Sequence, residues 1–297
     1  MEGSAMIRHL AAVLLLLILG GCQQPSDVEL TQEEYEADLE VRSVVVPDTH
    51  VVLIPVDSSA VLPEDQLEFR AFFLLNNVTH DAGGIRRSFS YSRVYAADSA
   101  IRFMGRTVGF RGMDLGNMRL NGVPMIKLPH IVRIKRGSQP DSLVLGGFEY
   151  LQDLTGQYQP DQPYLWSAST PGMGTISQGI RSAGNLIVHS PAGGSVVSRE
   201  KDLALRWTGA GGHLSVIISS FDPWTNRTRP LLEFRSRANS GRALIPGKLL
   251  RELPRQHPYY VFTFVLANRV DTVVLQGYSG RVMVQAASIY NSYVELR

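Results

Sequence analysis

The sequence contains a single cysteine, few histidines and only four lysines among its 297 residues. One cysteine cannot form an intrachain disulfide, so the chain is not a disulfide-stabilised scaffold. The histidines lack the H-x-x-x-H or H-E-x-x-H spacing of metal sites. Beyond the N-terminal segment they are His50, His80, His130, His189, His213 and His257. His80 adjoins Asp81, but neighbouring residues of a strand point to opposite faces and could not share a metal ion. We interpret the pair as solvated loop residues beside the Gly83-Gly84 turn. We therefore expect no metal site and no cofactor.

The common catalytic motifs are also missing. The sequence has no G-x-S-x-G nucleophile elbow. The glycine-rich stretch Gly209-Ala210-Gly211-Gly212 has neither a following helix pattern nor the Lys-Ser/Thr pair of a phosphate-binding loop. The sequence therefore predicts a protein that is not an enzyme and has no catalytic residues.

Only one long apolar run is present, Leu10–Leu19. It covers about half of the roughly 20 residues that a helix needs to cross a bilayer. Arg8 precedes it and a pair of small residues follows it. This arrangement predicts a signal peptide at residues 1–21 and not a transmembrane helix.

The end of that segment, Leu19-Gly20-Gly21-Cys22, resembles the lipobox of bacterial lipoproteins. The resemblance implies cleavage between Gly21 and Cys22, followed by attachment of acyl chains such as palmitate to Cys22. Several acyl chains anchor a protein to a membrane without spanning it. The family's inner-membrane retention signal is an aspartate after the cysteine, and this chain has Gln23 there. We therefore expect the protein to be anchored in the outer membrane of the bacterial cell envelope.

Charge is distributed unevenly along the chain. Residues 22–42 carry seven acidic residues against one base, Arg42, and few apolar residues, which predicts an extended acidic tether. From residue 43 onward, 27 basic residues oppose 19 acidic ones, a net charge of +8. These bases are spread along the sequence, so nucleic acid is not an expected partner.

Past residue 43, apolar and polar residues alternate in short runs separated by Gly, Pro, Asn and Asp. Period-two runs rich in β-branched and aromatic residues predict strands, and their spacing predicts an all-β fold of the sandwich type. The small polar stretch Gly179–Asn185 predicts a boundary between two β-sandwich domains, residues 43–180 and 185–297. Asn121-Gly122 predicts a tight hairpin, and Pro246–Leu253 predicts one short helical turn.

The second predicted domain resembles the immunoglobulin-like and fibronectin-like sandwiches of bacterial surface proteins. The matching residues are the strand 186–190, the turn Ser190-Pro191-Ala192-Gly193-Gly194, and the strand that ends in Trp207-Thr208. The resemblance implies that Trp207 lies between two sheets. It does not indicate a function, because this fold serves many.

An aromatic stretch in the first predicted domain leaves an alternative open. Three acids, Glu149, Asp153 and Asp161, accompany Phe148, Tyr150, Tyr158, Tyr164 and Trp166. We interpret these aromatic residues as strand core. The alternative is an envelope glycan-active hydrolase with its site in residues 43–180, in which two carboxylates would have to converge in space.

The best candidate for a binding loop is Phe221–Pro230, which contains two prolines and the residues Trp224, Arg227 and Arg229. Trp and Arg are enriched among interface hot spots, and proline reduces the entropy that a loop loses on ordering. The hypothesis is an exposed tip that contacts an envelope glycan or protein. The alternative is that Trp224 folds back onto its own sandwich. The chain is therefore expected to be a lipid-anchored, non-catalytic binding or structural module.

Overall fold

The computed structural model describes residues 39–43 and 71–297, apart from 104–105, 137–138, 171–173, 210–212, 225–226, 237–240, 256–257, 274 and 276–277. The predicted signal peptide, the cleavage site at Gly21 and Cys22, and most of the predicted tether lie outside these residues. So do the predicted strands between residues 44 and 56.

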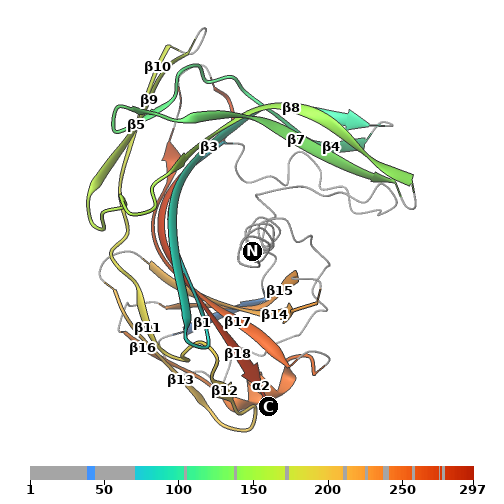
Figure 1. Cartoon of the computed structure of the whole chain (residues 1–297), viewed down its shortest axis with the longest axis vertical. Coiled ribbons are helices and arrows are strands. Elements are labelled where there is room, and N and C mark those ends of the chain that lie inside the picture. The colour runs from blue at the N-terminus through green and yellow to red at the C-terminus, as the bar shows by residue number, and fades with distance from the viewer. Residues whose placement is uncertain are drawn as a thin grey trace, which may run out of the picture.

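The described chain is an all-β protein, as the alternation predicts, and a single large sheet dominates it (Figure 1). This sheet has eleven described strands, and ten of them form the continuous order β1-β15-β14-β17-β18-β2-β3-β4-β8-β7. Their bounds are β1 Leu39–Ser43, β15 Arg227–Ser236, β14 His213–Asp222, β17 Tyr259–Val273, β18 Val282–Leu296, β2 Ala71–Ala82, β3 Ile85–Phe103, β4 Arg106–Gly112, β8 Gln139–Asp153 and β7 Ile126–Arg136. The short β12, Val196–Val197, pairs in parallel with the end of β18.

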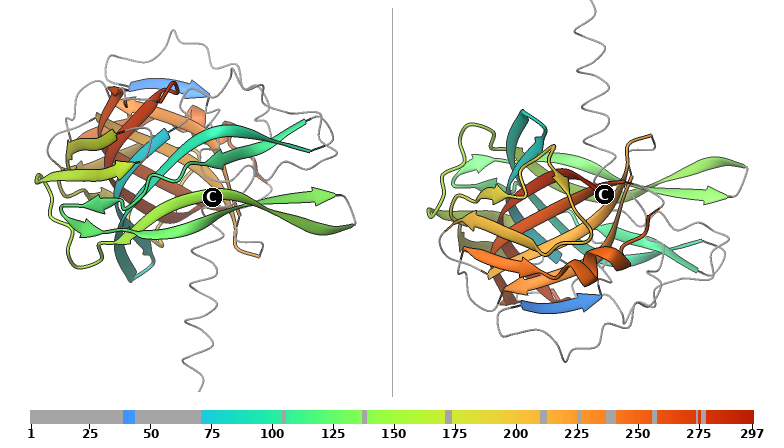
Figure 2. Two further views of the ribbon diagram at one scale, coloured as in Figure 1. Left: turned by 90° about the horizontal axis from the view of Figure 1, so that it is seen from above. Right: turned by 90° about the horizontal axis from the view of Figure 1, so that it is seen from below.

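The large sheet curves into a crescent, and two smaller sheets lie on its convex side (Figure 1). The four-stranded sheet has the order β10-β9-β5-β6, and the three-stranded sheet has the order β11-β13-β16. Their bounds are β10 Gly174–Arg181, β9 Pro163–Thr170, β5 Arg119–Leu120, β6 Val123–Pro124, β11 Ile187–Ser190, β13 Leu203–Thr208 and β16 Arg242–Ile245. Seen from above and below, the β3–β4 and β7–β8 hairpins extend beyond the other strands (Figure 2).

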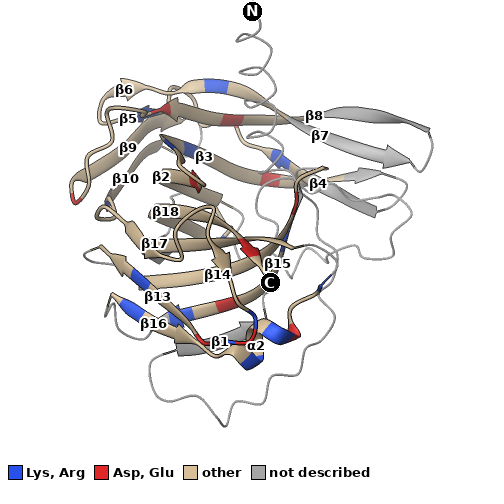
Figure 3. Ribbon diagram, turned by 60° about the horizontal axis from the view of Figure 1, so that its bottom comes forward, with Lys and Arg blue, Asp and Glu red and all other residues tan. Residues whose placement is uncertain are grey.

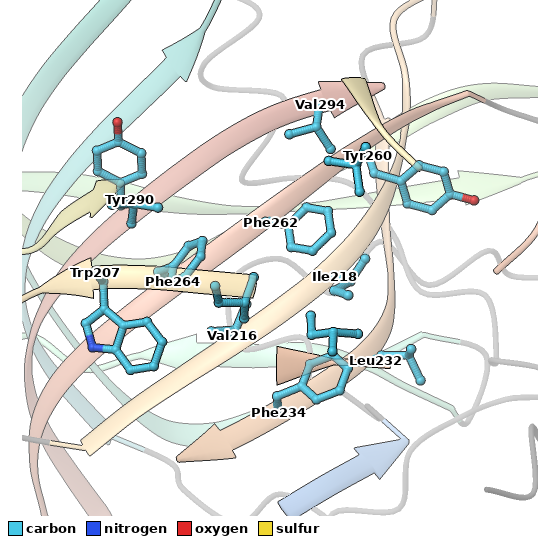
Figure 4. Close-up of a cluster of buried hydrophobic side chains, with 14 of the residues drawn as sticks. Trp207, Val216, Ile218, Leu232, Phe234, Tyr260, Phe262, Phe264, Tyr290 and Val294 are labelled. Atoms are coloured by element: carbon cyan, nitrogen blue, oxygen red, sulfur yellow. The ribbon is translucent and has the colours of Figure 1, made fainter. Parts of the chain in front are cut away.

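Each smaller sheet encloses a hydrophobic core against the same face of the large sheet. Under the four-stranded sheet, Phe73 of β2 meets Trp166 of β9 edge to face, with ring centroids 5.7 Å apart. Under the three-stranded sheet, Trp207 of β13 packs against Phe264 of β17, and both side chains are buried (Figure 4). The prediction that Trp207 lies between two sheets is confirmed.

Two separate sandwiches are not confirmed, because the two halves of the chain share the large sheet. β18 pairs in parallel with β2 over eleven positions, from Val282 with Ala71 to Ser292 with Asp81. The start of β18 packs in the first core, and its end packs in the second. The stretch 179–185 lies between Ile180 of the first core and Leu186 of the second, but it does not divide the cores along the chain, because Leu275, Val282, Val284 and Ala286 also belong to the first core.

Local signals in the sequence hold at several positions. Asn121 and Gly122 have φ of 49° and 80° and connect β5 to β6 in a tight hairpin. The predicted helical turn is α2, Gly247–Glu252, which begins directly after Pro246. The predicted tether was wrong at its C-terminal end, because residues 39–43 form β1 and pair with β15. Leu39-Glu40-Val41-Arg42 alternates with period two, the pattern of a strand and not of a self-repelling linker.

Candidate functional site

The predicted binding loop is a β-hairpin with a short exposed turn. β14 continues through Asp222 and β15 begins at Arg227, so only residues 223–226 connect the strands. The expectation that the whole of Phe221–Pro230 is a loop was therefore wrong. Pro230 is accommodated opposite Ser219, next to a break in the strand register, where a strand tolerates proline.

Trp224 stands at the tip of this hairpin and is 94% exposed. Its backbone N–H donates to Oδ1 of Asp222 at 2.9 Å, which orders the turn from within. Arg229 lies along β15, is half-buried and pairs with Ser220 in the strand register. Arg227 pairs with Asp222 through the backbone. The structure therefore places Trp224 in the exposed turn, Arg227 at the first position of β15, and Arg229 half-buried farther along that strand.

Other exposed apolar side chains gather at the same end of the large sheet, which we call the Trp224 end. β14 and β18 finish there, β17 begins there, and the β2–β3 hairpin turns there. Tyr259 at the start of β17, Ile85 after the β2–β3 turn, and Val196 beside the end of β18 are 44%, 62% and 56% exposed. Exposed apolar groups clustered on a folded surface mark contact sites more often than isolated ones do.

A buried carboxylate holds this end together. Oδ2 of Asp81 accepts hydrogen bonds from the Tyr290 hydroxyl at 2.6 Å and from Nη2 of Arg86 at 3.1 Å. Burial raises the pKa of Asp81, but the hydrogen bonds from Tyr290, Arg86 and the backbone of Gly193 outweigh it, and the pKa is lowered. The β2–β3 hairpin is thereby fixed to β18 and to the turn that contains Gly193.

The chain enters the sheet from the opposite end. β1 runs antiparallel to β15, with Leu39 paired to Ser236 and Ser43 to Leu232. β15 begins beside the Trp224 turn and finishes at Ser236, so the first described residue lies at the far end of that strand. A membrane anchor N-terminal to Leu39 would therefore be connected to the end of the sheet that lies away from Trp224.

The concave face of the large sheet carries a row of aromatic rings, which we call the aromatic row. Its successive members are Phe221, Tyr293, His80, Phe89 and Tyr91, with centroid separations of 5.3, 6.0, 5.8 and 6.1 Å. They come from β14, β18, β2 and β3, and each is partly exposed. The row begins on β14, which leads into the Trp224 turn, and crosses the central strands of the sheet as far as β3.

The row is uncharged at neutral pH. Burial lowers the pKa of His80 to about 4 and raises the pKa of Tyr293 to about 12. Nδ1 of His80 and the Tyr293 hydroxyl lie 3.1 Å apart in a hydrogen bond. The interpretation of His80 and Asp81 as solvated loop residues was wrong, because both lie in β2 and Asp81 is buried. They point to opposite faces of the strand, His80 into this row and Asp81 toward Tyr290. The row was not predicted from the sequence, although the alternation Phe89-Ser90-Tyr91-Ser92 indicates a strand with aromatic residues on one face.

A charged cluster lies on β3, β7 and β8, farther along the concave face. Arg93 donates to Oε2 of Glu149 through Nε at 2.9 Å and also through Nη2. His130 lies 4.0 Å from the same carboxylate oxygen, and its ring is 4.8 Å from that of Tyr95. Burial lowers the pKa of His130, which opposes the effect of Glu149. The cluster satisfies its own charges and leaves Glu149 committed to Arg93.

The aromatic stretch at 148–166 is mainly core, as interpreted. Tyr150, Tyr164 and Trp166 are buried, and the indole N–H of Trp166 donates to Ser92 at 2.8 Å. The acids have separate local contacts: Asp153 accepts from the backbone of Thr155, and the backbone carbonyl of Asp161 accepts from Arg181.

Charge and metal ligands do not define a site in the described part of the chain. Basic and acidic residues are scattered over the sheets (Figure 3). Within the described residues, no group of three or more His, Cys, Asp or Glu side chains could hold a metal ion. None of the described helices is long and apolar enough to span a membrane.

No protein-family model matches this chain, and no curated protein or solved structure matches it either.

Proposed function

We propose that this chain is a lipid-anchored, non-catalytic binding module of the bacterial cell envelope that contacts its partner through the Trp224 end. The observation that carries the proposal is the 94% exposure of Trp224 on a hydrogen-bonded hairpin turn. An exposed tryptophan costs solubility and gains nothing in the core, and tryptophan is among the residues most enriched in interface hot spots.

The direction of the chain supports a distal contact. Acylated Cys22 would hold the N-terminal segment at the outer membrane, and residues 23–38 would reach at most roughly 55 Å when fully extended. β1 joins the sheet at the Ser236 end, so the Trp224 hairpin would project away from the anchoring membrane. The expected partner is an envelope glycan or protein on that distal side.

Tryptophan fluorescence offers a direct test, because the other two tryptophans are buried, Trp166 at 0% and Trp207 at 2% exposure. Iodide should therefore quench the emission of Trp224 alone, and Trp224→Phe should abolish the quenching. In lipid-anchored protein, a bilayer with nitroxide-labelled acyl chains should leave Trp224 unquenched. Strong quenching by the labelled lipid would show that the hairpin lies on the membrane and would contradict a distal contact.

The partner itself can be trapped in cells. A photo-crosslinking amino acid at position 224 should give a discrete adduct, whereas the same amino acid at Leu165, which is 46% exposed on β9, should give none. The double substitution Trp224→Ala with Arg227→Ala should reduce retention on isolated envelopes and change stability by no more than about 0.5 kcal/mol. Equal adducts at both positions, or unchanged retention, would refute the assignment.

A further inference from the structure

The concave face carries a second surface, distinct from the exposed Trp224 turn, although its aromatic row begins at Phe221, close to that turn. The two smaller sheets cover the convex face, where the even-numbered side chains of β18 and Tyr260, Phe262, Phe264 and Leu266 of β17 are buried. On the concave face of β18, Met283 and Ala287 are buried, whereas Gln285, Asn291 and Tyr293 are partly exposed. The described residues contribute no further strand layer to this face.

We infer that the aromatic row is a binding site for a neutral oligosaccharide. A ligand on the face of a sheet meets only side chains, because the backbone N–H and C=O groups are already paired between strands. An extended peptide gains its main-chain hydrogen bonds at a sheet edge, which this face does not offer. Sugar hydroxyls, in contrast, bond to side-chain amides and hydroxyls, and the apolar faces of sugar rings pack against aromatic rings.

The side chains of the concave face have this mixed chemistry. Beside the rings stand Asn291 and Thr263, whose side chains are hydrogen-bonded to each other at 2.7 Å. The row itself holds neutral groups, whereas the Arg93–Glu149 pair lies beyond Tyr91 on the same strand. A neutral, hydroxyl-rich chain suits this surface better than an acidic polymer or an apolar helix, which would leave its amides unpaired.

A buried acceptor at the end of the row points to a ligand. Asn76 is 5% exposed and donates through Nδ2 to the Tyr91 hydroxyl at 3.0 Å. Among the described residues, Oδ1 of Asn76 has no hydrogen-bond partner. Buried side-chain polar atoms are rarely left unpaired in native proteins. A sugar hydroxyl lying beside Tyr91 would donate to this oxygen.

The size of the row suits several sugar units and not one. Four consecutive ring contacts connect β14 to β3, and at a strand spacing of about 4.8 Å these two strands lie roughly 19 Å apart across the sheet. A ligand that follows the row would cross the strands and lie along the curvature of the crescent (Figure 1).

The test uses the mature chain with Cys22→Ser, titrated calorimetrically with chitohexaose, cellohexaose and maltohexaose. We expect at least one of them to bind, and Phe89→Ala and Tyr293→Ala each to weaken that binding about tenfold. Tyr293→Phe keeps the ring and should retain most of the affinity. Leu165→Ala, on the convex side, is the matched control and should bind as the parent does.

The outcomes separate this inference from the proposed function. Trp224→Ala should leave oligosaccharide affinity unchanged, so loss of one activity does not imply loss of the other. Thermal melts of each variant show whether weaker binding reflects unfolding, and Phe89→Ala and Tyr293→Ala provide independent readings if one of them is unstable. Failure of all three hexasaccharides to bind overturns the inference. Row variants that bind as tightly as the parent also overturn it. Row substitutions that lower stability without changing binding overturn it as well, because they would show that another segment or a peptide covers the row.

Discussion

Truncation of Trp207 should destabilise both hydrophobic cores, although the residue belongs to only one of them. Trp207 is 2% exposed, and its ring lies 6.3 Å from that of Phe264 between the three-stranded sheet and the large sheet (Figure 4). Large-to-small substitution of such an aromatic residue costs about 3–5 kcal/mol, because contacts are lost and a cavity remains. With a urea m-value of about 3 kcal/mol/M, the unfolding midpoint should fall by roughly 1 M or more.

The shared sheet determines which protein should be measured. Residues 185–297 alone would expose the edge of β18 that pairs with β2, together with Val282, Val284 and Ala286, which pack in the first core. The mature chain is therefore the appropriate sample. In Trp207→Ala with Trp224→Phe, the only remaining tryptophan is Trp166, which lies in the first core and reports on it.

The matched reference is Trp207→Phe with Trp224→Phe, which also leaves only Trp166 but keeps an aromatic ring in the second core. If the cores unfold together, the urea midpoint reported by Trp166 fluorescence should be lower in the alanine variant than in the reference by the whole shift expected for the loss of the Trp207 ring. It should also coincide with the midpoint measured by circular dichroism. A Trp166 transition that stays in place while circular dichroism shows an earlier one would refute the coupling and restore two independent domains.

Three further predictions concern the anchor, a close backbone contact and a histidine. Cys22→Ser should abolish fatty-acid labelling and membrane fractionation, because serine cannot form the thioether. A Cβ at Gly147 would lie 1.9 Å from the Gly112 carbonyl oxygen, so Gly147→Ala should lower the free energy of unfolding far more than Gly84→Ala does. At Gly84 only the positive φ opposes alanine, at a cost of about 1–2 kcal/mol, and urea melts of the two variants measure the difference. Because His80 titrates at about 4 instead of 6.5, the unfolded state binds its proton first, and stability should fall by about 2–3 kcal/mol as the pH drops through that window. His80→Gln should flatten this part of the pH profile, and an unchanged profile would contradict the burial of His80.

Local structure could be predicted because its causes are local. The alternation of apolar and polar residues predicted strands, and Asn121-Gly122 predicted a tight hairpin. The burial of Trp207 between two sheets was also predicted. Pairing partners are not encoded in period-two patterns, so the parallel contact of β18 with β2 could not be foreseen. The aromatic row depends on that order of strands, since Tyr293 meets His80 only because β18 lies beside β2. The exposure of Trp224 could not be decided from the sequence, because the same turn could also let the ring fold back onto its own sheets; only the structure shows that it stands free at 94% exposure.

The pairing of β18 with β2 also bears on how the protein is made. Tyr290 and Asp81, which meet in the folded protein, are 209 residues apart in sequence. During synthesis or export, β2 and β3 emerge first but cannot complete the first core until β18 arrives. Contacts of such long range slow folding, and the waiting edge of β2 would be open to pairing with other chains. An early hairpin of this kind should therefore depend on chaperones until the last strand is available to pair with it.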